Sequence, residues 1–393
     1  MRSEKTGEKK KKSKGKIPLL IVILSYFIRP LTKKKGVFCF VATHKKPWGC
    51  NLEAYLLSLH ESQIARCIYI LNFGTTSNES IINETSQLNA NIAVIDRSNT
   101  WRLFKCVCKT DIFFMGDYSN NWLPGKKINL WHGIPLKKIG VLQTSKYKKL
   151  AKRFNNVISA ASKMDQSNMA QAFNMGLERV LPCGLPRHDW IAGNLKLPIR
   201  FNQQLECLDN ILAGRKLILY APTFRDKDRN GLALTSKQLK KWADFLQKEN
   251  YALGMRMHTR SGAKLNFDEL GVIDLSSKKF NHIEAIYRRA EILVTDYSSV
   301  SIDFMLTNKA IVGLDPSGDL YDRGFIGDFN LLFPGHFFNE FDVFLDYLKK
   351  IIQNPKGTEV QFDYSFHRRL FLGNYDNSAC EKLTKSLFEG EKS

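Results

Sequence analysis

The sequence lacks the short motifs by which many nucleotide-binding and metal-binding proteins are recognised. It contains neither a GxGxxG nor a GxxxxGK[ST] loop, so any nucleotide would have to be bound by another arrangement. Its eight cysteines include no CxxC pair and no histidine at metal-binding spacing. We interpret them as small core residues of a protein from a reducing compartment. Cys106-Val107-Cys108 alone is too little for a metal site, because no second pair of ligands accompanies it.

Long apolar runs are also absent. The apolar stretch at 17–28 has twelve residues, fewer than the roughly 20 needed to span a bilayer. No small-x-small cleavage site follows it, and the lysines after it oppose export. We predict that residues 17–35 form a monotopic membrane-contact segment at the cytoplasmic face, with a buried helix or a signal-anchor as alternatives. The lysine-rich residues 1–16 are expected to be a disordered tail.

Acidic residues are few relative to basic ones, which gives a net charge of +21 and favours an anionic partner. Residues 1–35 carry twelve Lys and Arg against two acids, and residues 137–154 carry seven against none. Two compact basic patches suit an anionic membrane surface better than a nucleic-acid groove. A nucleic-acid-binding protein is the non-enzyme alternative, but the second patch has only Tyr147 and Phe154 for base stacking.

What the sequence does contain is a regular alternation of short apolar strands and amphipathic helices. This pattern predicts an α/β protein with two doubly wound, Rossmann-like domains facing a cleft. The predicted strands are 37–41, 67–73, 91–95, 111–116, 128–131, 156–159 and 179–181, then 216–220, 251–257, 272–275, 292–294 and 310–314. We place an N-terminal domain at 36–195, a polar linker at 196–210, a C-terminal domain at 211–365 and a helical tail at 366–393. Ligands of such folds bind at the carboxyl ends of the strands.

The first candidate for chemistry is His132, which follows a strand and precedes a sharp turn at Gly133 and Pro135. Histidine titrates near neutral pH, so this residue is either a general base or a loop histidine without a role. Lys137 and Lys138 beside it would attract anionic groups in either case.

The other candidates lie at strand ends of the second half. Thr223 and Arg225 could grip a phosphate, and Arg323 could be aimed by the turn at Gly324. The strand and helix at 291–315 meet at Thr295-Asp296-Tyr297-Ser298-Ser299, where fresh N–H groups make either an ordinary cap or an anion site. His258 is either a phosphate-facing donor or a structural histidine. Asp226-Lys227-Asp228 is a DxD sequence, but a hard cation needs more carboxylates, so we predict no metal.

Together these motifs resemble the CDP-glycerol glycerophosphotransferases of teichoic-acid and capsule synthesis. The matching segments occur in the order WHGIPLKKIG, GLPRHD, YAPTFRD, the strand ending in His258, VTDYSSVSIDF with the following KAIVGLD, and YDRGF. The likeness extends from about residue 36 to the C-terminal helix. It implies a GT-B fold, peripheral attachment to the cytoplasmic face of the membrane, and a role for His132 as catalytic base. It also places His258, Thr295, Ser298, Ser299 and Asp303 around a CDP-linked donor.

From the motifs and the resemblance we expect glycerol phosphate to pass from CDP-glycerol to a hydroxyl of a lipid-linked glycan or polyol-phosphate acceptor, with release of CMP. His132 and His258 are the predicted catalytic residues, and no cofactor or metal is required. The residues predicted to bind the donor are Thr223, Arg225, Thr295, Ser298, Ser299, Asp303 and Arg323. Those predicted to face the acceptor and an anionic membrane are Lys137, Lys138, Lys148, Lys149, Lys152 and Arg153. The alternatives are a CDP-ribitol transferase and a GT-B glycosyltransferase that uses a nucleotide sugar.

Overall fold

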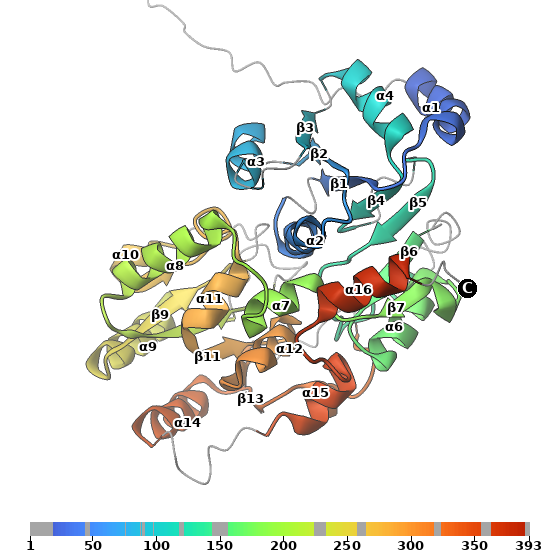
Figure 1. The fold of residues 1–393 in the computed structure, drawn as a ribbon. Coiled ribbons are helices and arrows are strands. Elements are labelled where there is room, and N and C mark those ends of the chain that lie inside the picture. The colour runs from blue at the N-terminus through green and yellow to red at the C-terminus, as the bar shows by residue number, and fades with distance from the viewer. Residues whose placement is uncertain are drawn as a thin grey trace, which may run out of the picture.

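The chain folds into two parallel β-sheets covered by helices, which confirms the predicted α/β architecture (Figure 1). The computed structural model describes residues 19–43, 48–74, 76–86, 88, 91–96, 98–117, 122–143, 156–223, 233–257, 265–317, 324–354 and 363–389. Both sheets have neighbouring strands that are distant in sequence, so helices must cross over between them.

The first sheet has seven strands, all paired in parallel. Their order is β3 (Ile92–Asp96), β2 (Cys67–Phe73), β1 (Val37–Thr43), β4 (Ile112–Met115), β5 (Lys126–Asn129), β6 (Asn156–Ala160) and β7 (Val180–Pro182). Successive residues of β1 point to opposite faces, so Phe38 and Phe40 enter one core while Cys39 and Val41 enter another. Both faces of this strand are therefore buried, as its unbroken apolar sequence predicts.

Helices cover both faces of the first sheet. They are α1 (Leu19–Thr32), α2 (Cys50–Glu61), α3 (Asn78–Thr85), α4 (Thr100–Lys109), α6 (Lys163–Phe173) and α7 (Pro186–Ala192), with the 3-10 turns η1 (Gly140–Leu142) and η3 (Leu177–Arg179). The core on one face includes residues of α2, and the core on the other includes residues of α4.

The second sheet has six parallel strands. Their order is β10 (Val272–Asp274), β9 (Tyr251–Met255), β8 (Lys216–Ala221), β11 (Ala290–Thr295), β12 (Ala310–Leu314) and β13 (His336–Phe338). The sequence pattern did not predict β13. Its helices are α9 (Ser236–Lys248), α10 (Phe267–Leu270), α11 (Ile283–Arg289), α12 (Val300–Phe304), α13 (Phe329–Leu332), α14 (Phe341–Gln353), α15 (Ser365–Leu372) and the 3-10 turn η4 (Met305–Thr307).

The stretch predicted as a polar linker is mostly helical. It forms α8 (Ile199–Leu212), a helix that the sequence pattern did not predict. Apolar residues recur at helical spacing: Phe201 and Leu205 enter the core of the first half, while Leu208 and Leu212 enter that of the second. Because one helix contributes to both cores, it connects the sheets as a packed element.

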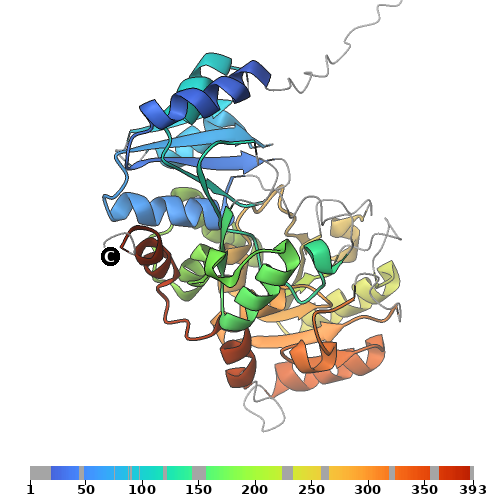
Figure 2. The ribbon, with the colours of Figure 1, turned by 90° about the vertical axis from the view of Figure 1, so that its right-hand side faces the viewer.

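The C-terminal helix α16 (Ala379–Phe388) returns to the first half and packs beside α2, as both views show (Figures 1 and 2). The ring of Phe388 lies 5.4 Å from that of Phe38, and the hydroxyls of Tyr55 and Thr384 are 3.1 Å apart. The carboxylate of Asp189 accepts the first backbone N–H groups of α16 and so caps this helix. The predicted helical tail is thus part of the packed structure.

The N-terminal helix α1 lies on the surface against α4 and carries its apolar residues outward. Ser25 and Arg29 face the protein, and Arg29 donates to the backbone carbonyls of Thr110 and Asp111 beyond the end of α4. The exposed apolar residues are Leu19, Leu20, Ile23, Leu24, Tyr26, Phe27 and Leu31. The alternative of a helix buried in the first domain is therefore wrong. Within the described ranges no helix is both long and apolar enough to cross a membrane.

The cysteines are free thiols, and five of the eight are buried as expected. Cys50 and Cys67 are half-buried, and Cys207 lies exposed on α8. Among the residues that the structure describes, no group of three or more His, Cys, Asp or Glu side chains is placed to hold a metal ion.

Candidate active site

The two halves meet at the carboxyl ends of their strands, where the fold predicts a ligand site. The segment that follows β5 crosses to the second half and forms an antiparallel bridge between Lys137 and Phe325. The Lys138 N–H donates to the Gly324 carbonyl at 3.0 Å, and the Ile326 N–H donates to the Leu136 carbonyl at 3.1 Å. Two backbone hydrogen bonds thus hold the segment that follows His132 against the second half.

His132 is held in one tautomer by a backbone contact. Its Nδ1 lies 3.1 Å from the carbonyl oxygen of Gly116, at the end of β4. A carbonyl oxygen only accepts, so Nδ1 must carry the proton and Nε2 keeps the lone pair. This is the form that a general base requires. The ring of Trp131 lies 4.1 Å from the imidazole and restricts its orientation further.

The backbone just before His132 is unusual. Trp131 has φ 51°, in the left-handed region that non-glycine residues rarely adopt. The side chain of Asn51 donates to the carbonyls of Leu130 and Trp131 at 3.0 and 3.1 Å, and the Asn129 side chain accepts the Trp131 N–H at 2.9 Å. Strained backbone of this kind persists only where its surroundings enforce it and is common at functional sites.

Gly133 brings this loop close to the start of α12. Its φ is 156°, and a Cβ built there would lie 3.2 Å from Ser299 Oγ. Ser299 occupies the N-cap position of α12 but makes no side-chain capping hydrogen bond. Simple capping therefore does not explain this hydroxyl, which lies beside Gly133, the residue after the candidate base. Ser298 Oγ instead accepts the Val300 N–H at 3.4 Å.

The helix itself is short. α12 has five residues and runs into the 3-10 turn η4, so its dipole is small. An anion at this place would be held by local N–H groups and hydroxyls. The electrostatic attraction that the dipole of a long helix would exert on an anion is not available from a helix as short as α12.

Thr295 and Asp296 hold the strand ends together. Thr295 is fully buried and its hydroxyl donates to the Ala221 carbonyl at 2.7 Å, while Asp296 Oδ1 accepts the Thr223 N–H at 2.8 Å. Thr223 also accepts a hydrogen bond from Lys137 Nζ at 3.4 Å. Lys137, predicted to face the acceptor, is thus placed beside a residue predicted to bind the donor, whereas Lys138 is exposed.

Asp303 is buried in an ion pair. Its carboxylate contacts the guanidinium of Arg187 at 2.5 Å and His188 Nε2 at 3.1 Å. Burial alone would raise the pKa of the Asp303 carboxyl, but Arg187 and His188 outweigh burial and hold this pKa below its usual value. Sequence reasoning gave no role to Arg187 or Asn51, although Arg187 lies in the GLPRHD segment that carries the family resemblance.

The remaining predicted site residues lie outside the described ranges. They are Arg225, His258, Arg323, Lys148, Lys149, Lys152 and Arg153. Their predicted roles stay predictions.

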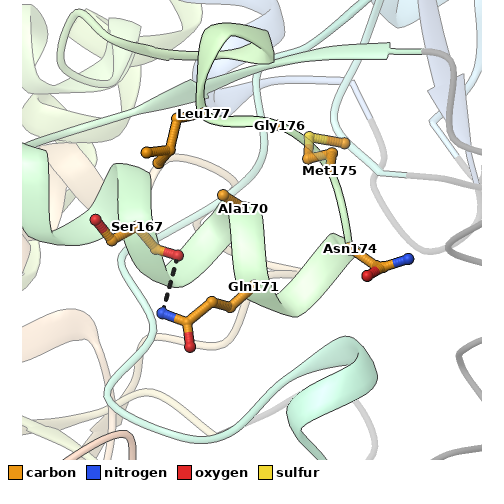
Figure 3. A pocket seen from close by; sticks show the side chains of 7 residues that line it. All are labelled: Ser167, Ala170, Gln171, Asn174, Met175, Gly176 and Leu177. Atoms are coloured by element: carbon orange, nitrogen blue, oxygen red, sulfur yellow. Dashed lines mark hydrogen bonds between the residues drawn. The ribbon is translucent and has the colours of Figure 1, made fainter.

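A surface hollow of about 540 Å³ lies elsewhere, along α6 and the turn that follows it (Figure 3). It is lined by Ser167, Ala170, Gln171, Asn174, Met175, Gly176 and Leu177. None of these residues belongs to the predicted site, and none has a charged side chain, so the hollow offers no group for the expected chemistry.

The two Rossmann-like halves joined at their strand ends define the GT-B fold class. The fold comparison agrees: the wall teichoic acid polymerase TagF superimposes with a TM-score of 0.73 at 18% identity, covering 97% of this chain and 94% of that one. A UDP-GlcNAc 2-epimerase from Neisseria meningitidis shares the architecture more distantly, with a TM-score of 0.55 at 10% identity, covering 90% and 99% of the two chains.

Within this class, the chain belongs to the CDP-glycerol:poly(glycerophosphate) glycerophosphotransferase family, whose model matches residues 23–389. It is 27% identical over 290 residues to a teichoic acid glycerol-phosphate transferase of Staphylococcus aureus, covering 67% of this chain and 71% of the relative. It is 26% identical over 308 residues to the teichoic acid ribitol-phosphate polymerase TarK of the same organism, covering 73% and 58%. The resemblance seen in the motifs is confirmed, and the chain is an enzyme of the CDP-glycerol phosphotransferase class.

Proposed function

We propose that this enzyme transfers glycerol phosphate from CDP-glycerol to a hydroxyl of a lipid-linked glycan or polyol-phosphate acceptor, in teichoic-acid or capsule-type polymer synthesis. The observation that carries the proposal is the hydrogen bond between His132 Nδ1 and the Gly116 carbonyl. This bond would leave Nε2 of His132 available as a base, in a loop whose next residue, Gly133, lies beside Ser299. The family match and a TagF structure soaked with CDPG support the donor.

In the reaction, the acceptor hydroxyl oxygen attacks the phosphorus that carries glycerol. A new P–O bond forms, the bond between this phosphorus and the bridging oxygen breaks, and CMP leaves with the bond's electron pair. His132 Nε2 takes the hydroxyl proton during the attack. A positioned base of this kind contributes about a hundred- to ten-thousandfold in rate.

The donor's phosphates would lie between the start of α12 and the end of β8. Ser298 and Ser299 supply hydroxyls there, Thr223 lies opposite, and Lys137 adds positive charge from the first half. Arg225, His258 and Arg323 keep their predicted donor-side roles as part of this proposal. Donors fixed in advance stabilise the charge that develops on the departing CMP.

In this proposal Thr295 and Asp303 support the donor site through contacts with other protein groups, and their side chains do not bind the donor. The Thr295 hydroxyl already bonds to a strand carbonyl, and the Asp303 carboxylate is enclosed by Arg187 and His188. A carboxylate facing the donor would repel its diphosphate, so an Asp303 turned toward Arg187 suits the proposed substrate better.

The first half, 36–195, would present the acceptor and the second, 211–365, the donor. Peripheral attachment to the cytoplasmic face of the membrane fits α1, whose outward side chains Leu19, Phe27 and Leu31 are 72, 73 and 88% exposed. Lys33, Lys34 and Lys35 follow this face and are exposed as well. Trp101, 62% exposed on the neighbouring α4, adds a side chain typical of membrane interfaces.

A donor screen tests the proposal. Purified protein is incubated with a synthetic lipid-linked disaccharide and one donor, which is CDP-glycerol, CDP-ribitol or a UDP-sugar. Release of CMP or UDP is measured, and the mass of the product is determined by mass spectrometry. We expect CMP release and addition of glycerol phosphate. Turnover with CDP-ribitol alone would favour the ribitol alternative, which the likeness to TarK motivates. Turnover with a UDP-sugar alone would contradict the proposed chemistry.

A further inference from the structure

A buried cluster of charged side chains joins the two halves directly behind His132. It consists of Arg187 and His188 at the start of α7 and Asp303 on α12. All three are buried, with exposed fractions of 6, 0 and 3%. In Figure 1, α7 and α12 lie at the junction between the upper and lower parts of the molecule. The contacts within this cluster therefore join the first half of the chain to the second.

Arg187 makes a second contact that links the cluster to the candidate base. Its Nη1 donates to the backbone carbonyl of His132 at 2.9 Å, while its Nη2 contacts Asp303. One guanidinium thus joins the His132 backbone to a carboxylate on α12. The fork geometry of arginine fixes both directions at once, which a lysine ammonium cannot do.

The backbone of Arg187 is tied to the same loop. Its N–H donates to Asn51 Oδ1 at 3.0 Å, and the other end of the Asn51 amide donates to the Leu130 and Trp131 carbonyls. The strained Trp131 and the adjoining His132 are therefore held from both sides by one connected set of hydrogen bonds. Because α12 begins at Ser299, the same set also fixes the distance between base and donor site.

A buried ion pair is a poor way to gain stability alone, since desolvation opposes the attraction and apolar residues often serve as well. Its directional bonds are better suited to fixing geometry. A displacement of about 1 Å can cost a hundredfold in rate when reacting groups must be aligned.

We propose that Arg187, held by Asp303, is a positioning residue that fixes His132 relative to the start of α12. This inference rests on the proposed role of His132 as base. It assigns to Arg187 no contact with the donor and no part in proton transfer.

The main test uses the double variant Arg187→Met with Asp303→Asn, which removes both charges together and leaves an oxygen for His188. We expect it to fold, to bind CDP-glycerol within about threefold of the wild type, and to lose about a hundredfold in kcat. In an H132A background the same pair of changes should lower kcat no further, because the side chain that Arg187 positions has been removed. Loss of CDP-glycerol affinity with kcat intact would make Arg187 a donor ligand and overturn the proposal.

The matched control is Glu53→Gln, which breaks another buried pair between the halves. Glu53 Oε2 lies 2.8 Å from His282 Nε2, and neither side chain touches the His132 loop in the contacts described. We expect this variant to lose stability while kcat stays within about threefold, because no aligned group moves. Equal losses of kcat in both variants would reduce Arg187 to a structural role and contradict the proposal.

A second readout does not depend on the substrate. In the ¹⁵N–¹H spectrum of histidine side chains, the His132 signals are identified by their absence in H132Q. The double variant should shift or broaden them, and Glu53→Gln should leave them unchanged. Unchanged His132 signals in the double variant would overturn the proposal even if another donor proves to be the substrate. Wild-type inactivity with every CDP-alditol, together with the expected shift, would overturn only the proposed function.

Discussion

His282 Nε2 lies 2.8 Å from Glu53 Oε2, and this buried pair joins α2 of the first half to the start of α11 in the second. Burial disfavours the charged imidazole, but Glu53 more than offsets this effect, so the pKa of His282 lies above its usual value. The backbone N–H of His282 also donates to the side-chain oxygen Oε1 of Gln204, on α8, at 3.0 Å. The interface between the halves therefore contains a titratable contact.

Stability should fall as the pH rises above neutrality. Because the folded-state pKa of His282 exceeds the unfolded-state pKa of about 6.5, the pair contributes fully below that pH and its contribution is lost as pH rises through the folded pKa. Glu53→Gln should lower the free energy of unfolding by about 1–3 kcal/mol at pH 6, and by less at pH 9. Urea unfolding at both pH values measures this difference. A control is Lys241→Gln in the exposed pair with Asp342, and an equal effect of Glu53→Gln at both pH values would contradict the assignment.

Lys137 should contribute to donor binding. Its Nζ lies 3.4 Å from Thr223 Oγ1, so its charge is on the donor side of the junction. Lys137→Met should raise the Kd for CDP-glycerol about tenfold, as expected for loss of one charge-assisted contact. Calorimetry measures this Kd. Lys138→Met is the control, since Lys138 is exposed. Equal effects of the two changes would indicate general attraction between basic surface and anion, without a specific contact.

Ser299 should bind the donor through its hydroxyl, which makes no capping bond to α12. Ser299→Ala should weaken CDP-glycerol binding about three- to tenfold, the range for one hydrogen bond, with little change in melting temperature. Ser236→Ala at the start of α9 serves as control. If the affinity of Ser299→Ala for CDP-glycerol is unchanged, Ser299 does not bind the donor and serves only the local backbone structure.

The outward face of α1 should attach the enzyme to anionic membranes. Replacing Phe27 and Leu31 by Glu removes two of its most exposed apolar side chains and leaves Arg29, which holds α1 to the protein, in place. The variant should no longer sediment with anionic liposomes, while its melting temperature stays near that of the wild type. Wild-type binding should weaken as salt rises, because the flanking lysines are screened. Sedimentation of the variant at the wild-type level would rule out this face.

Apart from β13, the strands could be predicted from sequence because most of them are short apolar runs. In β1, for example, alternate residues such as Phe38 and Cys39 enter two different cores. The helix α8 was missed because half of its residues are polar, although Phe201, Leu205, Leu208 and Leu212 follow a helical period. Burial of that stripe depends on two cores that only the tertiary structure brings together.

The same limit applies to the site. His132 could be singled out as a candidate because its strand end and its turn are local features. The roles of Arg187 and Asp303 depend on a contact across 116 positions of sequence, and that of Asn51 on one across 79. Thr295 was expected to face the donor because hydroxyls favour helix starts, but its hydroxyl bonds to the neighbouring strand. A side chain's direction follows from packing, which residue type alone does not specify.

The most direct test of the catalytic proposal is the turnover number of His132→Ala for CMP release from saturating CDP-glycerol with a lipid-linked acceptor. Binding of CDP-glycerol, measured by calorimetry, should persist, and turnover should fall at least a hundredfold, the lower bound for loss of a general base. His336→Ala, which changes an exposed histidine on β13, should retain full turnover. If His132→Ala keeps more than about a tenth of the wild-type rate, His132 is not the base.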